Sequence, residues 1–191
     1  LTLVFGIGIA YIIVRKRYKV ISGFINSIIM VPYVIPGTVL AVGFIMIFNK
    51  EPLLLTGTWV ILVLSYFIRK LPYLVKSAEA SLHSGHRALE EAAMSSGATP
   101  LRSFKDITFP LMISGVISGA TLSFLQIMTE LSSTIILYRP PYVTMPVVIF
   151  ENTMSSGADF GIAASMGVLL MLFVYIPLLL VNKVTRVKAE V

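Results

Sequence analysis

The chain contains no cysteine and few charged residues, and each absence excludes a class of protein. Without a thiol it forms no disulfide, no thiolate metal site and no cysteine nucleophile. Asp, Glu, Lys and Arg together make up 13% of the 191 residues, whereas soluble domains average about 25%. Such a composition leaves too little polar surface to cover a water-soluble fold, so we expect a membrane protein.

Apolar residues make up 57% of the chain and gather in five segments. Because about 20 apolar residues cross a bilayer as a helix, we expect an all-α membrane protein with five transmembrane helices. Pro32 and Pro36 are expected to break the second segment. The first segment is too short to span alone, so we interpret the chain as part of a longer protein. The segments are residues 1–14, 21–48, 58–68 with a less regular continuation through 71–75, 111–138 and 160–181.

Basic residues accumulate on one side of the five expected helices. If the cluster at residues 15–19 is cytoplasmic, alternation of the segments puts most other Lys and Arg on that side, with Arg69 and Lys70 at the membrane edge. Only Lys50 and Arg139 fall on the opposite side. The positive-inside rule predicts this asymmetry. We therefore interpret the net charge of +6 as topology, with a cytoplasmic C-terminus and no nucleic-acid partner. The same-side residues are Arg69, Lys70, Lys76, Arg87, Arg102, Lys105, Lys183, Arg186 and Lys188.

One long, mainly polar stretch, residues 76–110, falls on the cytoplasmic side, and its last part reads LEEAAMSSGATPLRSFKDITFP. Residues 88–94 favour a helix, and Gly97 is suited to a left-handed turn that ends it. Thr99 can cap a following helix whose first position suits Pro100. The sequence therefore predicts a short helix, a tight turn and a second helix that leads into the membrane.

The spacing within this stretch resembles the EAA loop of binding-protein-dependent ABC importer permeases, whose pattern is EAA-x3-G-x9-I-x-L-P. The single departure is Phe109 in place of Leu. The resemblance implies a type I importer permease core: one transmembrane domain over residues 1–191, with a cytoplasmic coupling helix between its third and fourth membrane helices. An ordinary amphipathic linker is the alternative. The residues implied to couple to the ATPase are Glu90, Glu91, Ala92, Ala93, Gly97, Ile107 and Pro110.

The resemblance also implies the partners and the location of the protein. A permease of this family is a multi-pass protein of the bacterial inner membrane. It works with a cytoplasmic ABC ATPase dimer, an extracytoplasmic substrate-binding protein and a second permease half, fused or identical. ATP and Mg²⁺ belong to the partner ATPase, so we expect no cofactor, no metal site and no catalytic residue in this chain.

Residues 130–145, ELSSTIILYRPPYVTM, resemble the segment ELPATLLLRPPGFDTLA of ferric-iron importer permeases, which implies ferric iron as the substrate. Phosphonate, thiamine, sulfate and polyamine permeases share the segment more loosely and stay as alternatives. An acid within an apolar span costs about 2.5–3.5 kcal/mol to insert and usually faces a bundle interior or an aqueous path. Glu130 and Ser133 are therefore candidates for the translocation path. Alternatively, Glu130 orients the following segment through hydrogen bonds without touching substrate.

Two other classes of protein account for the sequence less well. A secondary transporter would use Glu130 as a proton site but leaves the EAA spacing unexplained. A membrane-embedded enzyme needs several catalytic groups at membrane depth, and Glu130 stands there without a second acid, a histidine or a cysteine. A ladder of small residues in the fourth segment predicts close helix packing, with a role in lining the pore as the alternative. Its members are Ser114, Gly115, Ser118, Gly119 and Ser123.

Overall fold

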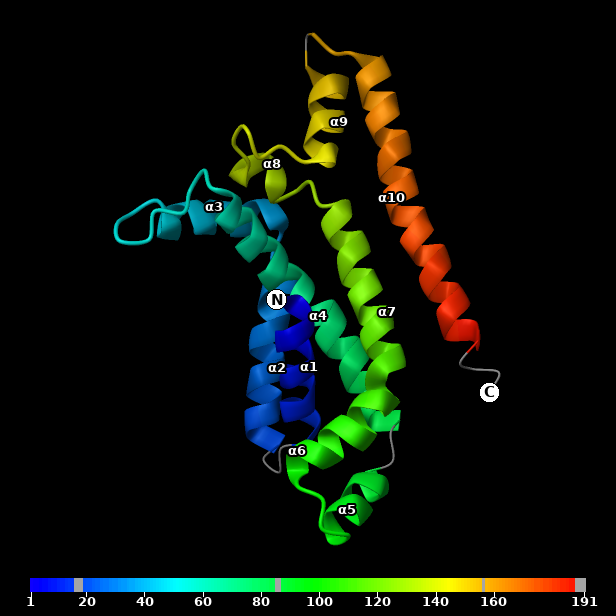
Figure 1. Cartoon of the computed structure of the whole chain (residues 1–191). Helices are drawn as coiled ribbons and strands as arrows, with labels where there is room; N and C mark the ends of the chain where they lie inside the picture. Colours follow the sequence, from blue (N-terminus) through cyan, green and yellow to red (C-terminus); the bar gives the residue numbers. More distant parts are fainter. Residues whose placement is uncertain (16–18, 85–86, 156, 188–191) are drawn as a thin grey trace. The chain divides into compact units, whose positions relative to one another are not determined.

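The computed structural model describes residues 1–15, 19–84, 87–155 and 157–187, and every regular element in these ranges is helical (Figure 1). Lys16, Arg17 and Lys188, which the topology prediction used, lie outside the described ranges. In chain order the elements are α1 (Thr2–Arg15), α2 (Lys19–Val34), α3 (Gly37–Phe48), α4 (Trp59–Ser84), α5 (Arg87–Ser95), α6 (Pro100–Ser103), the π-helix η1 (Phe104–Thr108), α7 (Phe109–Met128), α8 (Thr134–Leu137), α9 (Met145–Met154) and α10 (Phe160–Val187).

The chain divides into two compact units. The first comprises Leu1–Ile29 and Leu71–Ser123, and the second comprises Met30–Lys70 and Phe124–Val191. Each of α2, α4 and α7 contributes residues to both units.

Small residues hold α7 close to α4 within the first unit. Ser77 Oγ donates a hydrogen bond to the backbone oxygen of Gly115 at 2.8 Å. A Cβ on Gly115 would lie 2.0 Å from Ser81 Oγ, and one on Gly119 would lie 2.7 Å from Ser77 Cβ. No side chain fits at these two positions without a shift, so the predicted close packing is confirmed at Gly115 and Gly119.

The second apolar segment breaks at Pro36, as expected, whereas Pro32 lies inside α2. The chain bends by 103° between the helices on either side. A proline disfavours helical geometry at the residue before it, here Ile35, and Pro36 then stands as the N-cap of α3.

The core of the second unit forms where α3, α4 and α8 meet. Its buried members are Ala41 and Phe44 of α3, Ile61 and Leu62 of α4 and Leu137 of α8. Helix α9, which lies between the fourth and fifth apolar segments, packs along α10 (Figure 1).

The third segment differs from its prediction. Helix α4 continues without a break from Trp59 to Ser84, through Pro72. Arg69 and Lys70, expected at the end of a membrane span, therefore lie in the middle of a helix. Burial of Lys70, which is 5% exposed, shows that these cations have a partner inside the fold.

All five apolar segments contain helices, but they differ in how well each could cross a bilayer. By length and composition, Pro100–Met128 and Phe160–Lys183 can each span a membrane, and the bent α2–α3 pair can form a third span. Helix α1 is apolar but has only 14 residues. A count of five transmembrane helices therefore stays a prediction.

The packing of α4 against α7 leads to the first testable prediction. Gly115→Ala should destabilise the protein by about 1–3 kcal/mol, because the added methyl group overlaps Ser81 Oγ and the Ser77 carbonyl. The matched control is Gly8→Ala in α1, where an added Cβ meets nothing within 4 Å. Unfolding in mixed detergent–SDS micelles measures both variants, and equal stabilities would contradict the packing assignment.

Candidate functional site

Helix α5 ends in a Schellman motif, as the sequence led us to expect. Gly97 has a φ of +92°, a conformation that favours glycine. The Gly97 amide donates to the oxygen of Met94, and the Ala98 amide donates to the oxygen of Ala93, both at 3.0 Å. Thr99 then caps α6 by accepting from the Arg102 amide at 3.3 Å, and Pro100 is the first helical residue. The predicted helix, turn and second helix are confirmed.

One side of α5 is exposed and built from small residues around a single acid. We call it the outer face and define it by Ala88, Glu91, Ala92 and Ser95, all of which are exposed. Ser95 Oγ donates to the backbone oxygen of Glu91 at 2.9 Å, which keeps the serine close to its own helix. The result is a low surface, with one carboxylate, that a second protein can approach closely.

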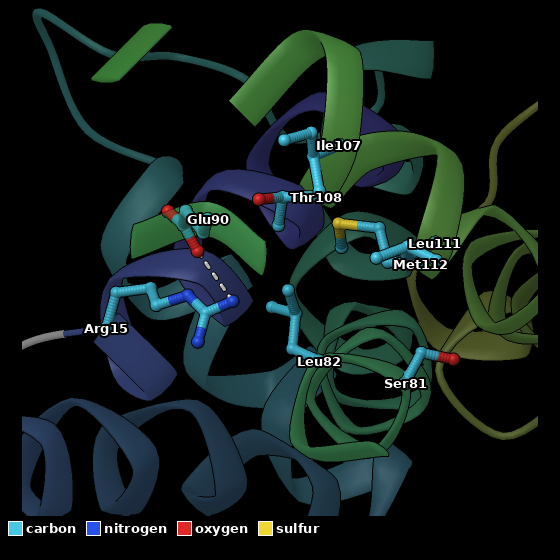
Figure 2. Close-up of a pocket in the computed structure, with 8 residues that line it drawn as sticks. All are labelled: Arg15, Ser81, Leu82, Glu90, Ile107, Thr108, Leu111 and Met112. Atoms are coloured by element: carbon cyan, nitrogen blue, oxygen red, sulfur yellow. Dashed lines mark ion pairs between the residues drawn. The ribbon is translucent and has the colours of Figure 1, made fainter. Parts of the chain in front are cut away.

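Glu90, also predicted to touch the ATPase, points away from this face and is 6% exposed. Its Oε2 lies 2.6 Å from Arg15 Nη2 (Figure 2), and its Oε1 accepts a hydrogen bond from Tyr11 OH at 2.9 Å. Ser103 Oγ donates to the Glu90 backbone oxygen at 3.3 Å. Sequence reasoning missed Arg15, Tyr11 and Ser103, because no local spacing links them to Glu90.

The rest of the predicted coupling set is spread over several elements. Ala93 is half-buried, while Gly97 is exposed at the turn after α5. Ile107 lies in η1 and lines the same pocket as Glu90 (Figure 2), and Pro110 is exposed at the start of α7. The structure thus brings Glu91 and Ala92 together on one exposed face and turns Glu90 and Ile107 inward.

The pocket beside Glu90 is narrow. Its volume is about 10 Å³, the space of about one ordered water, so it cannot hold a substrate. Figure 2 shows the Arg15–Glu90 ion pair at one end and Ser81, Leu111 and Met112 at the other. The lining residues are Arg15, Ser81, Leu82, Glu90, Ile107, Thr108, Leu111 and Met112.

The second candidate, Glu130, lies in the second unit between the end of α7 and the start of α8 and is 6% exposed. Two cations from α4 approach its carboxylate: Arg69 Nη1 lies 2.6 Å from Oε1, and Lys70 Nζ lies 2.5 Å from Oε2. The Ser133 amide and hydroxyl donate to Oε1 at 3.1 and 3.2 Å. Sequence reasoning did not link either cation to Glu130.

These contacts also explain why the fourth apolar segment breaks. Glu130 accepts from the amide of Ser133, which lies three residues later, while Thr134 Oγ1 donates to the Glu130 backbone oxygen at 3.0 Å. Tyr66 OH lies 2.7 Å from Thr134 Oγ1 and links this turn to α4. The geometry favours the orienting role that the sequence left open for Glu130 over direct contact with a cationic substrate.

Gly37 lies against the same cluster. A Cβ at this position would lie 2.7 Å from Arg69 Nη1 and 2.8 Å from Ser132 Cβ. The break at Pro36 and the break after α7 therefore meet at Arg69, and any larger residue at position 37 would require the guanidinium or Ser132 to shift. Within the described ranges, no three His, Asp or Glu side chains come together as they would to hold a metal ion.

These features agree with the comparison with known protein families. Residues 2–186 match the family described as binding-protein-dependent transport system inner membrane component, and the chain belongs to that family. The all-helical structure has the fold of type I ABC importer permeases.

Individual relatives differ in the cargo that their names give. The chain is 32% identical, over 171 residues, to the ferric transport system permease protein FbpB of Actinobacillus pleuropneumoniae, covering 90% of this chain and 24% of the relative. It is 29% identical over 163 residues to a putative 2-aminoethylphosphonate transport permease, PhnV, of Salmonella paratyphi A, covering 85% and 60%. The chain thus spans about a quarter of the length of the first relative and three fifths of the second.

A solved structure is similar over almost the whole chain. A chain of the inward-facing MetNI methionine ABC transporter superposes with a TM-score of 0.77 at 17% sequence identity. The superposition covers 97% of this chain and 87% of that one. At this identity the likeness establishes the fold alone.

The Glu130 cluster yields the second prediction. Glu130→Ala should destabilise the protein by about 3–5 kcal/mol, because it leaves Arg69 and Lys70 buried without their counter-charge. Glu51→Ala, which removes an exposed acid, is the control and should change stability by less than about 0.5 kcal/mol. SDS-induced unfolding of the purified protein measures both, and a similar small effect in the two variants would refute the buried-pair assignment.

Proposed function

We propose that the chain is the membrane-spanning permease of an ATP-driven importer and that α5 is its coupling helix. The observation that carries this proposal is the outer face of α5. Glu91 stands there between the small side chains of Ala88, Ala92 and Ser95, and all four are exposed. The family supplies the context, because its members belong to binding-protein-dependent transport systems.

The outer face suits a protein partner better than lipid. Small side chains let another backbone approach closely, and the carboxylate of Glu91 offers an acceptor to basic or hydroxyl side chains. Leu101 of α6, at 78% exposed, adds an apolar contact in the next element. We assign this surface to a groove of the cytoplasmic ATPase, which binds ATP and Mg²⁺ and performs the hydrolysis.

In this proposal the chain contributes no catalytic group and works by movement. Closure of two ATPase subunits would displace α5, and the membrane helices would change between inward- and outward-facing arrangements. The assignment places the 76–110 stretch and the C-terminus in the cytoplasm of a multi-pass inner-membrane protein. A second permease half and an extracytoplasmic binding protein complete the importer.

Ferric iron is the substrate that we propose, and its support comes from the FbpB relative and the 130–145 segment. The structure offers no free carboxylate at Glu130, because Arg69 and Lys70 neutralise it. A phosphonate is the second candidate, because it is the cargo named for the PhnV relative.

The coupling assignment predicts a specific effect of changing Gly97. Gly97→Val places a β-branched residue at a φ of +92°, which costs about 1–2 kcal/mol of backbone strain and disturbs the end of α5. Association with the ATPase and ATP-dependent uptake should both fall by roughly tenfold, while membrane insertion persists. Co-purification of the ATPase and uptake into proteoliposomes measure these effects.

The control for this variant is Gly157→Val. No atom lies within 4 Å of a Cβ added at either glycine, and Gly97 has a φ of +92°. The coupling assignment is wrong if Gly97→Val keeps normal ATPase association and uptake, or if Gly157→Val loses them equally.

The substrate proposal predicts uptake of ferric iron that requires ATP and the cognate binding protein. Proteoliposomes that contain the complete importer should accumulate radiolabelled ferric iron, and an excess of 2-aminoethylphosphonate should not compete. Uptake of labelled phosphonate without uptake of iron would overturn the iron assignment and support the second candidate. Either result leaves the permease assignment in place.

A further inference from the structure

Glu90 and Glu91 are neighbours in sequence, yet they face opposite surroundings: Glu91 is exposed and Glu90 is buried. We propose that Glu90 is a positioning residue that fastens α5 to α1, so that a force on the outer face of α5 reaches α1 directly. The tie itself is a property of this chain. Its role in transport rests on the proposed function.

The contacts of the Glu90 carboxylate support a firm connection. One oxygen pairs with Arg15 Nη2 at 2.6 Å, and the other accepts from Tyr11 OH at 2.9 Å. Residues 11 and 15 lie one helical turn apart, so both project from the same face of α1. Two separate side chains of one helix thus hold a single carboxylate of another, which restricts both sliding and rotation of α5 on α1.

Burial gives this connection its strength. The Arg15 and Glu90 side chains are 16% and 8% exposed, so water screens the pair much less than it screens a surface pair. Removal of one partner leaves the other charge buried without compensation, which is strongly unfavourable. If Glu90 turned outward to meet an ATPase, Arg15 would lose its counter-charge. The buried position therefore favours an internal role for Glu90.

A second set of contacts joins Glu90 and Tyr11 to the start of the helical segment Pro100–Met128. Ser103 Oγ donates to the Glu90 backbone oxygen at 3.3 Å. The Tyr11 ring packs edge-on against Phe104, with centroids 4.8 Å apart. Phe104 begins η1, and a π-helical turn is a common point of local adjustment within a helix. Movement of α5 can therefore pass both to α1 and, through η1, to α7.

The test uses the complete importer reconstituted with its ATPase and binding protein, and the permease alone in detergent. Glu90→Gln keeps the shape of the side chain but removes its charge. The double variant Glu90→Arg with Arg15→Glu restores a pair of opposite charges with reversed direction. The control is Glu79→Gln. It breaks the ion pair between Lys76 Nζ and Glu79 Oε2, which are 2.8 Å apart and both belong to α4.

Three quantities are measured: co-purification of the ATPase, substrate transported per ATP hydrolysed, and hydrogen exchange of the α5 amides. We expect Glu90→Gln to retain the ATPase but to transport about tenfold less substrate per ATP, with amide exchange in α5 faster by on the order of tenfold or more. The charge-reversed double variant should recover both values at least in part. Glu79→Gln should leave all three unchanged.

Loss of ATPase association in Glu90→Gln with unchanged exchange in α5 would overturn the proposal, because Glu90 would then be a partner contact. Unchanged transport per ATP in that variant would also overturn it. A wild-type permease that binds no ATPase would refute the proposed function instead. In that case the exchange measurements on the permease alone still decide whether Glu90 ties α5 to α1.

Discussion

A carboxylate that leaves water needs a counter-charge or strong hydrogen bonds, and this requirement organises both units of the protein. In the first unit Glu90 of α5 forms an ion pair with Arg15 and accepts a hydrogen bond from Tyr11, both of α1. In the second unit Glu130, in the turn after α7, forms ion pairs with Arg69 and Lys70 of α4. In an otherwise apolar chain these few polar contacts fix how particular helices meet, because apolar side chains alone pack in many registers.

Backbone breaks and small residues also determine how the helices pack. Pro36 separates α2 from α3, and Gly37 leaves room for Arg69 at the start of α3. In the other unit, Gly115 and Gly119 let α7 approach α4 closely. At each of these positions a steric constraint explains the residue type, and none of these constraints depends on which substrate is transported.

The sequence predicted local structure well because the relevant signals are local. Gly97, Thr99 and Pro100 mark the end of one helix and the start of the next, and the structure has both at those residues. The sequence did not predict the contacts of Glu90 and Glu130, because their partners are distant in the chain. Arg15 lies 75 positions before Glu90 and Lys70 lies 60 positions before Glu130, so no spacing rule connects them. Arg69 and Lys70 were therefore assigned to a membrane edge, and the contact of Glu90 with Arg15 was not foreseen.

The π-helical turn η1 has a consequence for how this segment can change in evolution. Pro100–Met128 forms one continuous helical span with η1 inside it. Each residue of an α-helix turns the chain by about 100°, so deletion of one residue from η1 would rotate α6 relative to α7, while the contacts of Glu90 hold α5 on α1. Ser103 would then no longer face Glu90. Substitutions within residues 100–108 preserve this rotation, whereas a change in the number of residues does not. The segment should therefore tolerate variation in composition far better than variation in length.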